Sequence, residues 1–121
     1  MTSYYLAGAN HDGEDKTHHF LKHNYLQVYY DGVIDQRLHD VQEGDRIAIK
    51  SRNGQGSSNI TIKAVGVVEG ITETADCVIF FMTWTEINSR EVESRGCFRR
   101  FHGPYEKNRS TRKWLRDIFA I

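Results

Sequence analysis

Short runs of β-branched and aromatic residues, separated by polar and glycine-containing segments, set the pattern of this chain. The most regular run is Gly44-Asp45-Arg46-Ile47-Ala48-Ile49-Lys50-Ser51. Side chains alternate between the two faces of a strand, so Ile47, Ile49 and Ser51 share one face. If the isoleucines point into a core, Ser51 points inward at its rim, where a small hydroxyl suits a ligand pocket. Lys50 lies on the other face, and we expect it to point outward.

Further segments have strand character because they combine β-favouring residues with bounding turn signals. The predicted strands are residues 3–9, 60–71 and 76–85, with residues 25–30 forming a strand or an extended aromatic segment. In the long strand, Gly66 and Gly70 predict a bulge or a bend. The segment 52–59 is predicted to be a loop, and residues 86–101 mix strand and helix character.

Three segments favour helix. Asp12 is a candidate N-cap for a helix that runs to about His23, and Ile34 to Val41 carries apolar residues at helical spacing. Ser110 or Thr111 can cap a closing helix. The apolar stripe of that helix consists of Trp114, Leu115, Ile118 and Phe119.

The order of the predicted elements indicates one α+β domain that spans residues 1–121. Along the chain a strand is followed by two helices, several strands and a final helix. This order lacks the regular alternation of strand and helix in a parallel α/β fold. We expect a small, curved, mostly antiparallel sheet or β-barrel flanked by two to four helices. Turns are predicted at Asp31-Gly32 and at Gly103-Pro104.

Composition changes this picture little. The longest apolar run, Val78 to Met82, is far shorter than the roughly 20 residues that span a bilayer. The N-terminus carries no export signal. Cys77 and Cys97 form no C-x-x-C motif, so we expect two reduced thiols, with Cys77 in the core. Together these features predict a cytoplasmic protein without membrane association.

The charge distribution adds a candidate partner. Residues 1–88 carry 7 Lys/Arg and 12 Asp/Glu, whereas residues 89–121 carry 9 Lys/Arg and 4 Asp/Glu. A basic segment of this kind suits a polyanion, although a solvated face that balances an acidic body would have the same composition. The candidate phosphate contacts, interleaved with aromatic residues, are Arg99, Arg100, Arg109, Arg112 and Lys113.

Several segments together resemble a known group of domains. They are Tyr5-Leu6-Ala7-Gly8, Phe20-Leu21, the 44–51 segment, Ala64-Val65-Gly66-Val67-Val68 and an aromatic strand with Trp84. Across residues 4–85 the chain resembles PUA-like superfamily domains of the EVE/YTH type. It resembles in particular the N-terminal DNA-reading modules of McrB-like AAA+ modification-dependent restriction proteins. Related modules often carry Gly-Ile-Trp after the first helix, where this chain has Asn24-Tyr25-Leu26.

The resemblance implies a small barrel whose mouth takes a base flipped out of double-stranded DNA, often a methylated base. Such a base needs stacking surfaces and polar groups that read its edge. By position, the base pocket would comprise Ala7, Gly8, Ala9, Asn10, Tyr25, Tyr29, Tyr30, Ser51 and Trp84. Lys50 and Arg52 would join the phosphate contacts. Trp84 also fits a core position near the rim, and Lys50 also fits a plain surface lysine.

The leading hypothesis is therefore a non-catalytic DNA-binding module that serves a restriction or antiviral defence system. The AAA+ motor would lie in the same or a partner chain. The alternatives are an RNA reader of the same fold, a protein-interaction domain, or a small metal-dependent nuclease that uses the His/Asp/Glu residues of segment 11–23. We expect no cofactor and no metal, because His19 and His23 are not part of a His-Glu-x-x-His motif. The sequence also contains no Walker A or Rossmann signature.

Overall fold

The computed structural model describes residues 2–30, 36–54 and 56–120. Its main element is a seven-stranded sheet with the order β4-β7-β6-β5-β1-β9, in which β8 also pairs with β6. The strands are β1 (Tyr4–Gly8), β4 (Tyr25–Tyr29), β5 (Arg46–Arg52), β6 (Asn59–Glu73), β7 (Cys77–Glu86), β8 (Arg90–Glu93) and β9 (Phe101–Tyr105). A separate hairpin consists of β2 (Asn10–His11) and β3 (Glu14–Asp15). The helices are α1 (Thr17–His23), α2 (Gln36–Asp40) and α3 (Arg112–Phe119).

The sheet is mixed but mostly antiparallel, which confirms the predicted α+β class. β1 and β5 are parallel neighbours, whereas β5, β6, β7, β4 and β8 pair in antiparallel ladders. The predicted barrel is not found: among the described residues, no ladder joins the outer strands β4 and β9. α2 lies against β9, so that a helix rather than a strand is the neighbour of this edge.

Two apolar clusters cover the two faces of the central strands. Tyr5 and Ala7 of β1 belong to the first cluster with Ile47 and Ile49, whereas the alternate residues Tyr4 and Leu6 belong to the second. The middle of each of these two strands is therefore buried on both faces, and the residues there, Tyr4 to Ala7 in β1 and Ile47 to Ile49 in β5, are apolar without interruption.

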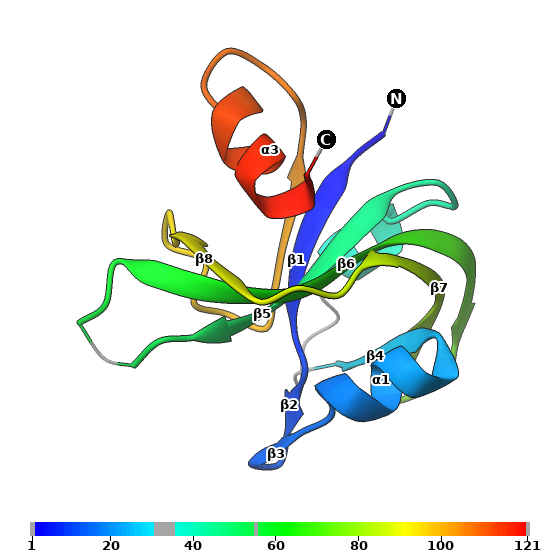
Figure 1. The fold of residues 1–121 in the computed structure, drawn as a ribbon. Helices are drawn as coiled ribbons and strands as arrows, with labels where there is room; N and C mark the ends of the chain where they lie inside the picture. The colour runs from blue at the N-terminus through cyan, green and yellow to red at the C-terminus, as the bar shows by residue number, and fades with distance from the viewer. Residues whose placement is uncertain (1, 31–35, 55, 121) are drawn as a thin grey trace.

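The helices cover different ends of β1. α3 lies near the start of β1, while α1 lies beyond its end, next to the β2–β3 hairpin (Figure 1). The ring of Phe119 in α3 is 5.0 Å from the ring of Tyr4. All four residues of the stripe predicted for this helix, Trp114, Leu115, Ile118 and Phe119, are buried.

The prediction that the first helix begins at Asp12 is wrong. Asp12 and Gly13 have φ values of 53° and 81° and form the turn of the β2–β3 hairpin. An Asp-Gly pair suits this turn because both positions need a positive φ. The helix begins at Thr17, whose amide and hydroxyl both donate to Oδ1 of Asp15, at 2.9 and 2.6 Å.

The segment after β7 also differs from expectation. Gly103 and Pro104 lie inside β9 rather than in a turn. β9 is an outer strand, where proline is tolerated because its missing N–H can face away from the ladder. The mixed segment 86–101 contains β8. The predicted turn at Asp31-Gly32 and the predicted helix start at Ile34 lie outside the described residues.

The irregularity predicted at the two glycines of the long strand is confirmed. The β6–β7 ladder shifts register between Val65 and Gly66 and again between Val68 and Gly70. Within the described residues, no helix is both long and apolar enough to cross a membrane.

Candidate functional site

A cavity of about 340 Å³ opens where the parallel strands β1 and β5 end side by side. This volume is near the lower end of the range for ligand pockets, roughly 300–1,000 Å³. We call this cavity the cationic pocket. Its lining residues are Gly8, Ala9, Asn10, Asp15, Thr17, Lys50, Ser51, Arg52, Lys63, Phe98, Arg99 and Arg100.

Backbone pairing brings the pocket walls together. Gly8 and Lys50 are direct partners in the β1–β5 ladder. On its other side, the amide of Gly8 donates to the carbonyl of Arg100 at 2.7 Å, which holds the 98–100 segment against the end of β1. Gly8 and Ala9 carry little or no side chain, so space remains between the two walls. The site thus combines segments that are about 40 and 90 positions apart in sequence.

The pocket is strongly cationic. Its lining contains five Lys or Arg side chains and one carboxylate, that of Asp15. Asp15 already accepts a hydrogen bond from Nζ of Lys63 at 2.6 Å. Partial burial raises the pKa of Asp15, but the hydrogen bonds from Lys63 and Thr17 outweigh this effect and lower the pKa to about 2. The carboxylate is therefore ionised at neutral pH and engaged with Lys63.

Lys50 does not point outward as predicted; the residue is only 5% exposed. β5 is an interior strand with apolar clusters on both faces, so neighbouring segments cover a residue on either face. The β5–β6 ladder also shifts register between Ile49 and Lys50. Burial lowers the pKa of Lys50, an effect that Cys97 opposes and Arg52 reinforces.

Phe98 is the one aromatic side chain among the described lining residues, and it is 40% exposed. The guanidinium carbon of Arg52 lies 5.1 Å from the centre of its ring, a cation–π arrangement. The adjacent amide of Arg99 donates to Nε2 of His102 at 2.9 Å. Phe98 therefore offers an apolar face at the rim of an otherwise polar pocket.

Eight of the residues predicted for the site line the cationic pocket: Gly8, Ala9, Asn10, Lys50, Ser51, Arg52, Arg99 and Arg100. Ala7, by contrast, is fully buried in the first apolar cluster, because both faces of β1 are covered. The pocket residues that sequence reasoning missed are Asp15, Thr17, Lys63 and Phe98. If Asp12-Gly13 had been interpreted as a hairpin turn, the returning strand would have been predicted to bring Asp15 near the end of β1.

The aromatic residues predicted to line the base pocket lie elsewhere. Tyr25 packs edge-on against Phe20 at 5.0 Å, and Tyr29 packs edge-on against His11 at 5.1 Å. Both tyrosines line a cavity of about 350 Å³. Tyr29 also lines a cavity of about 430 Å³ that shares Phe98, Arg99 and Arg100 with the cationic pocket. Nε1 of Trp84 donates to the carbonyl of Phe20 at 3.1 Å, so this side chain connects β7 to α1. None of the three belongs to the cationic pocket.

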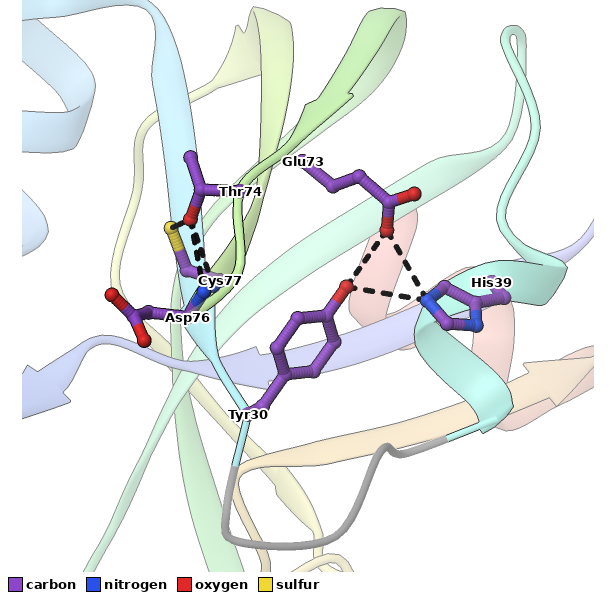
Figure 2. Close-up of polar contacts among 6 residues, drawn as sticks. All are labelled: Tyr30, His39, Glu73, Thr74, Asp76 and Cys77. Carbon is purple, nitrogen blue, oxygen red and sulfur yellow. Dashed lines mark hydrogen bonds and ion pairs between the residues drawn. The ribbon is translucent and has the colours of Figure 1, made fainter.

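Tyr30 lies in another polar cluster, shown in Figure 2. Its hydroxyl donates to Oε2 of Glu73 at 2.8 Å and lies 3.2 Å from Nε2 of His39. The same nitrogen of His39 is 3.3 Å from Glu73. Glu73 is the last residue of β6, ten positions from Lys63, so this cluster and the cationic pocket lie at different points along β6.

The remaining basic residues are also separate from the pocket. Lys113 lies 3.8 Å from Asp117 on α3 and lines a cavity of about 560 Å³ between β8 and α3. Arg112 begins α3, and Arg109 precedes it. Thr111 is the N-cap residue, but its side chain makes no capping hydrogen bond. The predicted basic surface is thus divided between two regions.

The His/Asp/Glu segment 11–23 was the predicted alternative site for a metal-dependent nuclease. Among the described residues, no group of three or more His, Cys, Asp or Glu side chains is arranged to hold a metal ion. Burial lowers the pKa of His11, and the charges of Arg100 and Lys16 lower it further. Cys77 and Cys97 are buried free thiols.

Comparison with known proteins adds no family to these observations. The chain matches no protein-family model, and no curated protein matches it.

Proposed function

We propose that this domain is a non-catalytic nucleic-acid-binding module whose cationic pocket accepts one nucleotide turned out of DNA. The observation that carries the proposal is the convergence of five cationic side chains on one cavity of about 340 Å³. Lys and Arg side chains supply the attraction to phosphate that dominates nucleic-acid affinity. Phe98 adds a face on which a base can stack.

The preference for DNA rests on the resemblance to PUA-like domains of the EVE/YTH type. The proposal includes this family assignment, with the open sheet as a variant of the expected barrel. It also includes a modified, methylated base as the guest and an AAA+ motor as the partner. Tyr25, Tyr29 and Trp84 do not line the cationic pocket, so stacking inside it depends on Phe98.

Binding to matched oligonucleotides tests the proposal. Fluorescence anisotropy would compare duplex DNA with unmodified bases, N6-methyladenine, 5-methylcytosine and 5-hydroxymethylcytosine, together with single-stranded DNA and RNA. We expect tighter binding to one modified duplex, with an affinity that falls steeply as salt rises. Arg99→Ala should weaken binding about tenfold and reduce the salt slope by about one.

Two variants separate the pocket from the rest of the surface. Tyr30→Phe removes a hydroxyl in the Glu73–His39 cluster and should leave affinity unchanged. Arg112→Ala removes a charge at the start of α3 and tests whether that region contacts the backbone. Equal affinity across the DNA panel would remove the modified-base part of the proposal. Preference for RNA would favour an RNA reader, and no salt-dependent binding to any oligonucleotide would contradict the proposal as a whole.

A further inference from the structure

Lys50 is an unusual member of the cationic pocket. It is 5% exposed and lines the cavity. Among the described residues, its amine has no hydrogen-bond or ion-pair partner, whereas the amine of Lys63 in the same pocket is bound to Asp15. A largely buried cation without a counter-charge is costly, because the solvent that reaches its amine through the cavity compensates only in part for its desolvation.

The fold does not need this charge. The two residues that precede Lys50 on β5, Ala48 and Ile49, are fully buried apolar residues. An apolar side chain of similar length would continue the same pattern. A ligand that brings a negative charge to the pocket would compensate for the free-energy cost of burying the Lys50 amine without a counter-charge.

We infer that Lys50 is the anion anchor of the pocket and that its amine pairs with a phosphate group of the ligand. That this phosphate belongs to a nucleotide rests on the proposed function. Asp15 is engaged with Lys63, and the three further cationic side chains of Lys50, Arg52 and Arg99 carry more charge than a single carboxylate ligand would balance. A phosphate carries up to two negative charges and accepts hydrogen bonds from both Lys and Arg.

The neighbours of Lys50 fit this assignment. Gly8 lies directly across the ladder from Lys50 and brings no side chain that would block the amine. The backbone of Arg100 is held against Gly8, which places the Arg99-Arg100 pair on the opposite wall. The phosphate group would therefore lie between the end of β5 and the 98–100 segment.

Titration of the whole domain with small probes tests the inference. The probes are inorganic phosphate, a deoxynucleoside 5′-monophosphate and the same deoxynucleoside without phosphate, followed by ¹H–¹⁵N NMR. We expect the monophosphate to bind at least tenfold more tightly than the nucleoside, with shifts at Gly8 and Ser51. Lys50→Met should weaken monophosphate binding at least tenfold. Lys22→Met, which removes the same charge from an exposed position on α1, should change it less than twofold.

The outcomes separate this inference from the proposed function. If the monophosphate binds through Lys50 but no oligonucleotide binds, the anchor stands and the nucleic-acid function fails. If oligonucleotides bind the wild-type protein and Lys50→Met equally well, the function stands and the anchor is overturned. Equal binding of nucleoside and monophosphate would also overturn it. NMR spectra of Lys50→Met show directly whether the variant is folded, so a loss of binding is not mistaken for unfolding.

Discussion

The carboxylate of Asp15 accepts a hydrogen bond from Nζ of Lys63 at 2.6 Å, across 48 positions of sequence. This contact attaches the β2–β3 hairpin to β6 and forms one wall of the cationic pocket. It also engages the one carboxylate among the described lining residues, so that the pocket keeps its positive character.

Asp15→Asn should therefore lower stability and strengthen anion binding. The folded-state pKa of Asp15 is about 2, below its ordinary value near 3.9, so its stabilisation is present above about pH 4 and is lost as the pH falls through 2. The side chain of Asp15 is 50% exposed, and solvent screening limits the expected cost to about 0.5–1 kcal/mol at pH 7. Urea unfolding at pH 7 and pH 2 would measure it, and the difference between variant and wild type should shrink to a small part of its pH 7 value at the lower pH. Glu14→Gln, at a carboxylate that is 71% exposed, is the matched control and should have little effect.

Lys50→Met should stabilise the fold while it weakens phosphate binding. Burial holds the pKa of Lys50 below its ordinary value, so the unfolded chain binds more protons and wild-type stability rises with pH up to about 10.4. The variant lacks this cost, so we expect its free energy of unfolding to exceed that of the wild type by roughly 1–2 kcal/mol at pH 7. This gain should shrink as the pH approaches 10. Thermal unfolding between pH 6 and pH 10 would follow the gain. A loss of stability at neutral pH would show that the amine has a structural partner.

Trp84→Phe should affect stability rather than binding. The substitution removes the hydrogen bond from Nε1 to the carbonyl of Phe20, which then keeps only the backbone amide of Asn24 as its donor. The expected cost is about 0.5–1.5 kcal/mol in urea unfolding, because a net hydrogen bond contributes about that much. Oligonucleotide affinity should stay within twofold of wild type. A large loss of affinity at unchanged stability would instead support Trp84 as a stacking surface.

The two glycines of β6 should respond differently to alanine. A Cβ at Gly66 would lie 2.8 Å from the carbonyl oxygen of Thr83 and 2.8 Å from Cε3 of Trp84. Because a backbone atom must move to relieve this contact, Gly66→Ala should cost about 1–3 kcal/mol. At Gly70 the nearest atom is 3.4 Å away on the ring of Phe81, which is 48% exposed and can shift.

The free energy of unfolding of Gly70→Ala should therefore stay within about 0.5 kcal/mol of the wild-type value. Denaturant midpoints of the two variants, measured side by side, test this difference. Similar costs at both positions would mean that backbone conformation, and not the contact at Gly66, sets the requirement for glycine.

Much of the secondary structure follows from local pattern alone. The alternation in β5, the continuous apolar run in β7 and the stripe of Trp114 and Ile118 in α3 are properties of neighbouring residues, and the structure has each of these elements. The prediction of where the first helix starts was wrong because two local signals compete there. Asp12 can cap a helix or, with Gly13, form a hairpin turn, and the hairpin is what forms.

The site depended on information that is not local. The sequence predicted that the binding site includes Gly8, Asn10, Ser51 and Arg99. A strand pattern, however, does not specify which strands are neighbours in the sheet. The parallel pairing of β1 with β5 brings Gly8 beside Lys50, and the bond from Gly8 to Arg100 adds the third wall.

The side-chain pattern by itself determined the central strands and the apolar stripe of α3, but not the β2–β3 hairpin or β9. Only the tertiary structure decided that Lys50 is buried, since burial depends on what covers both faces of β5. It likewise decided that Trp84 and Tyr30 lie away from the pocket. The physical reason is that alternation assigns a side chain to a face, whereas the neighbours of that face come from segments far away in the chain.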